Sequence, residues 1–306
     1  MGISHYLKEI GRGKDGARAL SREQATDLMG QVLDGALTDL EVGGFCMAMR
    51  IKGETAQEMA GFLDAVQQRL NRLPASDQAV VVLPSYNGAR KLPVLTPLLA
   101  LLLAREGLPV LIHGTATESA RTLSSQVLDA LGIAAQTTPK KIACGEVAFS
   151  PTEQLSPALK RLLDVRRVIG LRNSAHSLVK LMQPVAGKAL LVSSYTHPEY
   201  AVSMAATFEL IKADALLLRG TEGEVVADAR RSPQMQGFIG GKRLLLQESL
   251  KGSLNSVPDL PTTIDAASTA RYIEAVLAGQ SPLPPPIAQQ VAHILHLVEQ
   301  LSTTPP

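Results

Sequence analysis

A strand, a helix and a second strand follow one another between residues 80 and 114, and this pattern restricts the chain to few folds. The β-branched run 80–83 ends at Pro84, residues 93–104 form an apolar helical segment, and residues 108–112 form a second apolar run. Two strands joined in this way pair in parallel, and the crossover is nearly always right-handed. The sequence therefore predicts an α/β domain with a central, mostly parallel sheet flanked by helices.

The alternation continues further along the chain. Residues 189–193 and 215–218 have the composition of buried strands, and residues 198–211 between them have that of a helix. Ligands of open α/β sheets bind beyond the carboxyl ends of the strands. The loops at 84–91 and 113–119 are therefore the expected places for a site.

The first part of the chain has helical periodicity instead. Apolar residues recur every three to five positions from residue 20 to 72, and the pairs Ser21 and Gln24, and Thr55 and Glu58, have the spacing of capping boxes. Gly53 stands where a left-handed residue would close the helix before Thr55. The sequence predicts a small helical bundle.

Composition excludes several classes of protein. The hydrophobic fraction of 45% is enough for a large core, and the longest apolar run, 98–104, is too short to cross a bilayer. Cys46 and Cys144 lie far apart in apolar surroundings, so we expect two small buried thiols, with neither a disulfide nor a metal site. No signal-length apolar run occurs in residues 1–10, and we expect a cytoplasmic protein with no membrane contact.

Several short motifs of the sequence resemble those of anthranilate phosphoribosyltransferase and its thymidine phosphorylase relatives. They are Lys-Gly-Glu-Thr at 52–55, His-Gly at 113–114, and Ile-Gly-Leu-Arg at 169–172 followed by Pro184. The resemblance implies a helical domain of residues 1–74 with an inserted segment near 153–186, and an α/β domain of residues 75–152 and 187–306. It also implies a homodimer formed through the helical domain.

The catalytic motifs of that family are altered here. Its glycine-rich pyrophosphate loop, G-T-G-G-D, corresponds to residues 84–90, which keep one glycine, and its K-H-G-N-R corresponds to residues 112–116, which lack the lysine, asparagine and arginine. No adjacent carboxylate pair replaces the magnesium-binding Asp-Glu near residues 221–225. We therefore expect that transferase activity is lost, with no catalytic residue, no cofactor and no metal.

Positive charge is concentrated in one part of the chain. Residues 160–188 carry seven cations and one acid, a local excess of six, whereas the whole chain has an excess of two and the remainder is thus acidic by four. For any single cation a solvated helix face is the simpler interpretation, but the cluster indicates a polyanion-binding surface. The predicted nucleic-acid-binding residues are Arg90, Lys91, Lys160, Arg161, Arg166, Arg167, Arg172, Lys180, Arg230 and Arg231.

The altered catalytic motifs together with the basic cluster are similar to the YbiB-like branch of the phosphoribosyltransferase family. This resemblance implies a non-enzymatic protein that binds nucleic acid. No zinc-finger spacing, basic zipper or RNP-type aromatic stretch is present, so the predicted binding of single-stranded DNA or RNA is not sequence-specific. Tyr86, Tyr195 and Tyr200 are candidates for stacking on bases where they are exposed.

Two other hypotheses stay open at this level. One is an active phosphoribosyltransferase or phosphorylase with an unidentified acceptor, for which His113, His176 and His197 are the candidate acid-base groups. The other is a protein that uses its basic face to bind an acidic partner protein. The sequence does not distinguish DNA from RNA as the ligand.

Overall fold

The computed structural model describes residues 2–13, 15–117, 120–251 and 258–303, which form two compact units. The helical unit comprises residues 1–71 and 152–184, and the α/β unit comprises residues 72–151 and 185–306. The expected combination of a helical bundle with a mostly parallel α/β domain is confirmed.

The helical unit contains seven helices among its described residues. They are α1 (Ser4–Ile10), α2 (Arg22–Leu33), α3 (Asp39–Lys52), α4 (Ala56–Gln67), α7 (Thr152–Leu155), α8 (Pro157–Ile169) and α9 (Ala175–Leu181). Both expected capping boxes are present, at the starts of α2 and α4, and Gly53 ends α3 with a φ of 79°. These local signals fix where the helices begin and end.

Helices α2 and α4 approach each other closely at Gly61. A Cβ atom on Gly61 would lie 2.2 Å from the carbonyl oxygen of Arg22, so only glycine fits there. Phe45 and Phe62 pack edge to face beside this contact, with ring centroids 5.8 Å apart, and both are fully buried. A glycine inside a helix is thus explained by packing rather than by flexibility.

The α/β unit is built on a seven-stranded sheet in the order β3-β2-β1-β4-β5-β6-β7. Its strands are β1 (Val80–Pro84), β2 (Val110–Gly114), β3 (Val147–Pro151), β4 (Ala189–Tyr195), β5 (Ala215–Arg219), β6 (Met235–Ile239) and β7 (Lys242–Gln247). Strands β1 to β5 pair in parallel, and β6 and β7 add an antiparallel edge.

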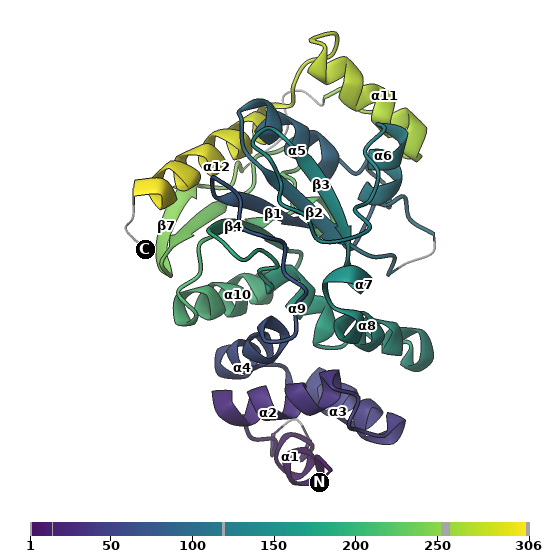
Figure 1. Ribbon diagram of the computed structural model, residues 1–306, viewed down its shortest axis with the longest axis vertical. Coiled ribbons are helices and arrows are strands. Elements are labelled where there is room, and N and C mark those ends of the chain that lie inside the picture. The colour runs from purple at the N-terminus through teal and green to yellow at the C-terminus, as the bar shows by residue number, and fades with distance from the viewer. Residues whose placement is uncertain (1, 14, 118–119, 252–257, 304–306) are drawn as a thin grey trace. The chain divides into compact units, whose positions relative to one another are not determined.

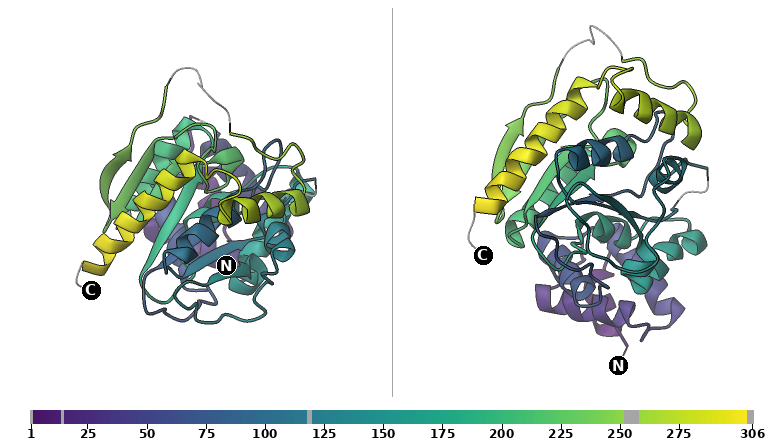
Figure 2. Two further views of the ribbon diagram at one scale, coloured as in Figure 1. Left: turned by 90° about the horizontal axis from the view of Figure 1, so that it is seen from above. Right: turned by 45° about the horizontal axis from the view of Figure 1, so that its top comes forward.

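Helices cover both faces of this sheet (Figures 1 and 2). They are α5 (Thr96–Arg105), α6 (Ser124–Ala130), α10 (Pro198–Leu210), α11 (Ala266–Leu277) and α12 (Pro285–Thr303), with a short 3₁₀ turn, η1 (Thr221–Gly223). Helices α5, α11 and α12 enclose the larger core with alternate residues of β1, β2, β4 and β5. On the opposite face Phe208 of α10 packs against Phe238 of β6, with ring centroids 5.3 Å apart.

One expectation about the cysteines is wrong. Cys46 is buried, but Cys144 is exposed, because it lies in a turn before β3 rather than in the apolar core. Within the described ranges, no helix combines the length and the apolar character that a bilayer crossing requires.

Candidate functional site

The loop after β1, residues 85–92, lies at the carboxyl end of the parallel sheet, where the sequence predicts a site. The end of β2 touches it directly, because a Cβ atom on Gly114 would lie 2.0 Å from the carbonyl oxygen of Ser85. Ser85 in turn donates its backbone N–H to the carbonyl of His113 at 2.8 Å. The loop is therefore held tightly to the sheet at its start.

A buried carboxylate fills the first half of this loop. Glu224 is only 2% exposed and accepts hydrogen bonds from the backbone N–H groups of Asn87 at 2.7 Å and Gly88 at 2.8 Å. The hydroxyls of Ser85 and Thr96 donate to its other oxygen at 2.5 and 3.0 Å. Donors of this kind satisfy the charge of a buried carboxylate, so Glu224 is a fixed part of the loop.

A second carboxylate occupies the other half. Glu222 accepts hydrogen bonds from the backbone N–H groups of Arg90 at 2.7 Å and Lys91 at 3.0 Å, and Leu92 N lies 3.5 Å away. Successive backbone N–H groups that converge on one point form an anion-binding nest. Glu222 has a φ of 53°, a conformation that costs about 1–2 kcal/mol for a residue with a side chain. The carboxylate contacts offset this cost.

These contacts bear on the magnesium and pyrophosphate ligands that the family resemblance implies. Glu222 and Glu224 stand nearest to the expected magnesium carboxylates, yet both direct their oxygens at the N–H groups of the loop. The backbone donors that would cradle a phosphate already have partners. The residues present therefore do not fit a magnesium-pyrophosphate site, and the described residues contain no group of three acidic, histidine or cysteine side chains placed to hold a metal ion.

A basic cavity of about 1070 Å³ adjoins the loop within the α/β unit. Five cationic side chains line it, against the two acids Glu222 and Asp228, which leaves a net charge of +3. Arg230 donates hydrogen bonds to the carboxylate of Asp228, with an ion-pair distance of 2.7 Å, and these contacts raise the pKa of Arg230; the charge of Glu222 contributes in the same direction. The cations are Lys91, Arg219, Arg230, Arg231 and Lys251.

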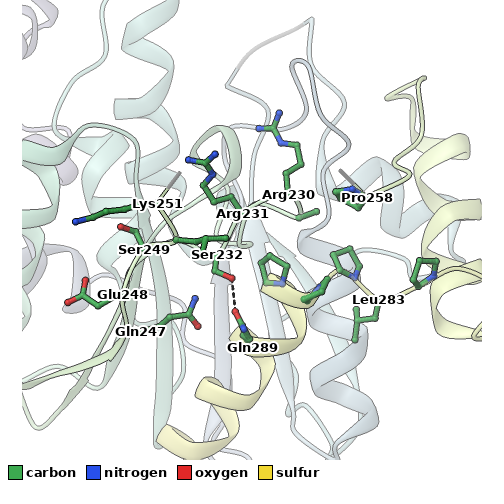
Figure 3. Close-up of a pocket in the computed structure, with 16 residues that line it drawn as sticks. Arg230, Arg231, Ser232, Gln247, Glu248, Ser249, Lys251, Pro258, Leu283 and Gln289 are labelled. Atoms are coloured by element: carbon green, nitrogen blue, oxygen red, sulfur yellow. Dashed lines mark hydrogen bonds between the residues drawn. The ribbon is translucent and has the colours of Figure 1, made fainter. Parts of the chain in front are cut away.

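A second cavity, of about 1160 Å³, shares part of its lining with the first. Arg230, Arg231 and Lys251 line both cavities, and Figure 3 shows them in the second. The wall opposite includes prolines before α12, and Ser232 donates a hydrogen bond of 2.6 Å to Gln289 of α12 across the cavity floor. Arg230 and Arg231 thus belong to the lining of both cavities.

Four predicted cations belong to the α/β unit, and the structure brings three of them together. Lys91, Arg230 and Arg231 line the basic cavity, whereas Arg90 is exposed on the adjacent loop. Lys188, which the sequence grouped with the basic cluster, also belongs to this unit, where its ammonium donates to the carbonyl of Leu301 at 3.0 Å. It is thus not part of the cavity lining.

The other six predicted cations belong to the helical unit. Helix α8 carries four of them with the single acid Asp164, so its net charge is +3. Asp164 accepts from Lys160 at 2.5 Å and lies 3.3 Å from Arg167, and Arg161 donates to the carbonyl of Leu33 at 3.1 Å. The six are Lys160, Arg161, Arg166 and Arg167 on α8, Arg172 after it, and Lys180 on α9.

The candidate stacking and acid-base residues differ in exposure. Tyr86 is buried, and its hydroxyl lies 2.9 Å from Nδ1 of His113, so it is a packing residue and not a stacking platform. Burial lowers the pKa of His113 to about 3, which leaves the imidazole neutral at physiological pH. Tyr195 lines the basic cavity, where burial raises its pKa and Arg219 opposes that rise, and Tyr200 is partly exposed.

Comparison with known proteins identifies the family. Residues 4–70 match the model of the glycosyl transferase family, helical bundle domain. Over 99% of its length the chain is 40% identical to the uncharacterized protein YbiB of Escherichia coli K12, of which it covers 96%. The chain belongs to the YbiB-like branch of the anthranilate phosphoribosyltransferase family.

More distant relatives of this YbiB-like protein are transferases by name. Anthranilate phosphoribosyltransferase of Symbiobacterium thermophilum is 29% identical over 90% of the chain and 81% of the relative. The solved structure of the Thermus thermophilus enzyme has a TM-score of 0.71 at 22% identity, covering 94% of this chain and 86% of that chain. The Saccharomyces cerevisiae enzyme in complex with PRPP and Mg has a TM-score of 0.69 at 14% identity, covering 97% and 89%. The solved structures establish the shared fold.

Sequence reasoning missed four residues of the site in this YbiB-like protein. Arg219 and Lys251 each stand alone among neutral neighbours, so no charge cluster marked them. Glu222 and Glu224 are separated by one glycine, so the sequence does not mark them as an adjacent carboxylate pair. The sequence signal connected with Glu222 and Glu224 is the loss of glycines at residues 84–90. The backbone amides of this loop donate to the two carboxylates rather than to a bound phosphate.

Proposed function

We propose that this YbiB-like protein binds single-stranded DNA or RNA without sequence specificity and has lost the transferase activity of its relatives. The observation that carries the proposal is the basic cavity beside a phosphate loop whose amides already hold Glu222 and Glu224. In this proposal internal carboxylates take the place that a bound diphosphate would occupy, and cationic side chains line the adjoining cavity.

Charge and chemistry at the cavity support a polyanionic ligand. Lys91, Arg219 and Arg231 supply donors for phosphate oxygens, and Arg230 is oriented by its bidentate contact with Asp228. Phosphate contacts fix a strand in place but carry no sequence information. Binding through this set is therefore expected to be strong at low salt and indifferent to sequence.

The preference for single strands rests on Tyr195. Its ring lines the same cavity as the arginines, and an aromatic ring beside cations is the arrangement by which unpaired bases are held. Paired bases in a duplex would keep their faces stacked on one another. An unpaired base can leave that stack and lie on the tyrosine.

The helical unit carries a second set of predicted cations. Helix α8 and the residues up to Lys180 carry the remaining predicted cations, and we propose that they also contact the phosphate backbone. A homodimer through the helical unit, in the cytoplasm, completes the proposal. Exposed apolar side chains on α3, among them Leu40 and Ile51, supply a surface that a second copy would cover.

The test is fluorescence anisotropy on a labelled 20-nucleotide single strand across a salt series. We expect binding at low salt whose affinity falls steeply as salt rises, with a slope of roughly −0.7 per phosphate contact, and equal affinities for unrelated sequences. Absence of binding at the lowest salt would refute the proposal. An assay for turnover of phosphoribosyl pyrophosphate, and for any dependence of its binding on magnesium, tests the loss of the parent activity, and we expect neither.

A further inference from the structure

The nest formed by residues 90–92 differs from its neighbour in how firmly its carboxylate is held. Glu224 is 2% exposed and bound by two hydroxyls in addition to two amides. Glu222 is half-buried, the described hydrogen bonds of its carboxylate come from backbone amides alone, and it lines the basic cavity. Of the two internal anions, Glu222 is the one that a ligand in the cavity can reach.

The chemistry of the nest suits phosphate as well as carboxylate. The amides of Arg90 and Lys91 are 2.7 and 3.0 Å from oxygens of Glu222, and a phosphate oxygen accepts such bonds in the same geometry. Arg230, Arg231 and Arg219 line the adjoining cavity and would neutralise the further charge of a phosphate. The carboxylate of Glu222 therefore occupies the nest in the way that a phosphate group would.

We propose that Glu222 is an internal competitor for phosphate: its carboxylate closes the nest of residues 90–92, and a phosphate group entering the basic cavity replaces it there. The identity of the phosphate carrier rests on the proposed function, in which a polynucleotide supplies it. The nest itself does not depend on that choice, because free pyrophosphate offers the same oxygens.

The positive φ of Glu222 makes glycine the best replacement for testing the proposal. A glycine adopts φ 53° without cost, so Glu222→Gly removes the competing carboxylate and keeps the turn that carries it. Glu222→Gln retains a side chain of the same size with a neutral acceptor. We expect phosphate affinity to rise in the order wild type, Glu222→Gln, Glu222→Gly.

Removal of any acid raises net charge by one and strengthens polyanion binding generally, so a matched control is required. Glu248 is exposed and lines the second cavity. Its carboxylate lies 3.4 Å from the side-chain amide of Gln234 and is not part of the nest. Glu248→Gln and Glu248→Gly therefore change the charge near the same arginines and leave residues 90–92 untouched. Urea unfolding of all four variants establishes that each is folded.

The experiment titrates wild type and variants with inorganic pyrophosphate and, separately, with the 20-nucleotide strand. We expect Glu222→Gly to bind pyrophosphate about tenfold more tightly than Glu248→Gly, which is the change that loss of one charge-assisted hydrogen bond to a competitor produces. Equal gains at the two positions, or weaker binding by Glu222→Gly, would overturn the proposal.

A second measurement uses the wild-type protein and needs no variant. In ¹⁵N-resolved spectra the amides of Arg90 and Lys91 should shift when pyrophosphate or oligonucleotide is added, while those of Asn87 and Gly88, held by Glu224, should not. Unshifted Arg90 and Lys91 amides with a saturated strand would rule out displacement. If the strand does not bind at all, the proposed function fails, whereas the pyrophosphate titration still decides the role of Glu222.

Discussion

Lys52 and Glu58 form a buried ion pair of 2.5 Å at the corner between α3 and α4. Glu58 is fully buried and also accepts the backbone N–H groups of Leu20 and Thr55, each at 2.9 Å. The Lys-Gly-Glu-Thr sequence of the family therefore has a structural role in this chain: it joins three segments of the helical unit through one carboxylate. Its presence is evidence of ancestry and fold rather than of catalysis.

The first prediction concerns this pair. Lys52→Met leaves Glu58 buried without its counter-charge, and we expect a loss of about 3–5 kcal/mol in the free energy of unfolding, measured in urea. Lys141→Met is the control, because the Lys141 and Asp77 pair is exposed at the surface and should contribute less than about 1 kcal/mol. Similar losses in both variants would contradict the role assigned to Glu58.

The second prediction concerns the cations of the helical unit. Joint replacement of Arg166, Arg167 and Arg172 by glutamate should weaken single-strand binding and reduce the steepness of the salt dependence by about 2, since three phosphate contacts are lost. The matched control replaces Lys8, Arg12 and Arg18 by glutamate, with the same change in net charge. An unaltered affinity in the folded first variant would remove α8 from the binding surface.

The third prediction follows from the lowered pKa of His113. The folded-state value of about 3 is below the ordinary value of 6.5, so only the unfolded chain takes up the proton between these pH values. Stability is therefore full above pH 6.5 and falls on acidification, by about 2 kcal/mol between pH 6.5 and 5. His113→Gln should remove this part of the pH dependence in urea unfolding. A variant that keeps the wild-type slope would show that other groups are responsible.

The fourth prediction separates the two cysteines. Burial raises the pKa of Cys46 to about 11, whereas Cys144 is exposed, so native protein should react with a thiol reagent once per chain. Cys144→Ser should abolish the fast reaction, and Cys46 should respond only after unfolding. Two fast reactions per chain would mean that the helical unit opens readily around Cys46.

Much of the fold could be read from the sequence, for reasons visible in particular elements. Strands β1, β2, β4 and β5 are buried apolar runs, and the capping boxes mark two helix starts. The sequence did not predict strand β7, because residues 242–247 lie at the sheet edge with most side chains exposed. They therefore lack the apolar pattern of a buried strand. The short pairing partner β6 and the strand β3 gave similarly weak signals.

The site was predictable in part. Loss of glycines from the loop after β1 shows in the sequence, and so does the clustering of arginines. The occupation of that loop does not, because Glu222 and Glu224 meet it across more than 130 residues of chain. Local patterns carry no record of a contact that distant.

The pairing of residues 85–92 with the turn that carries Glu222 and Glu224 also constrains how this lineage can change. Glycines added to the loop would leave two carboxylates in the space that a diphosphate needs. Removal of the carboxylates first would leave several backbone amides without partners. Under the proposed function, a return to diphosphate binding therefore needs changes in the loop and in the turn together, and substitutions at the two places should occur in combination.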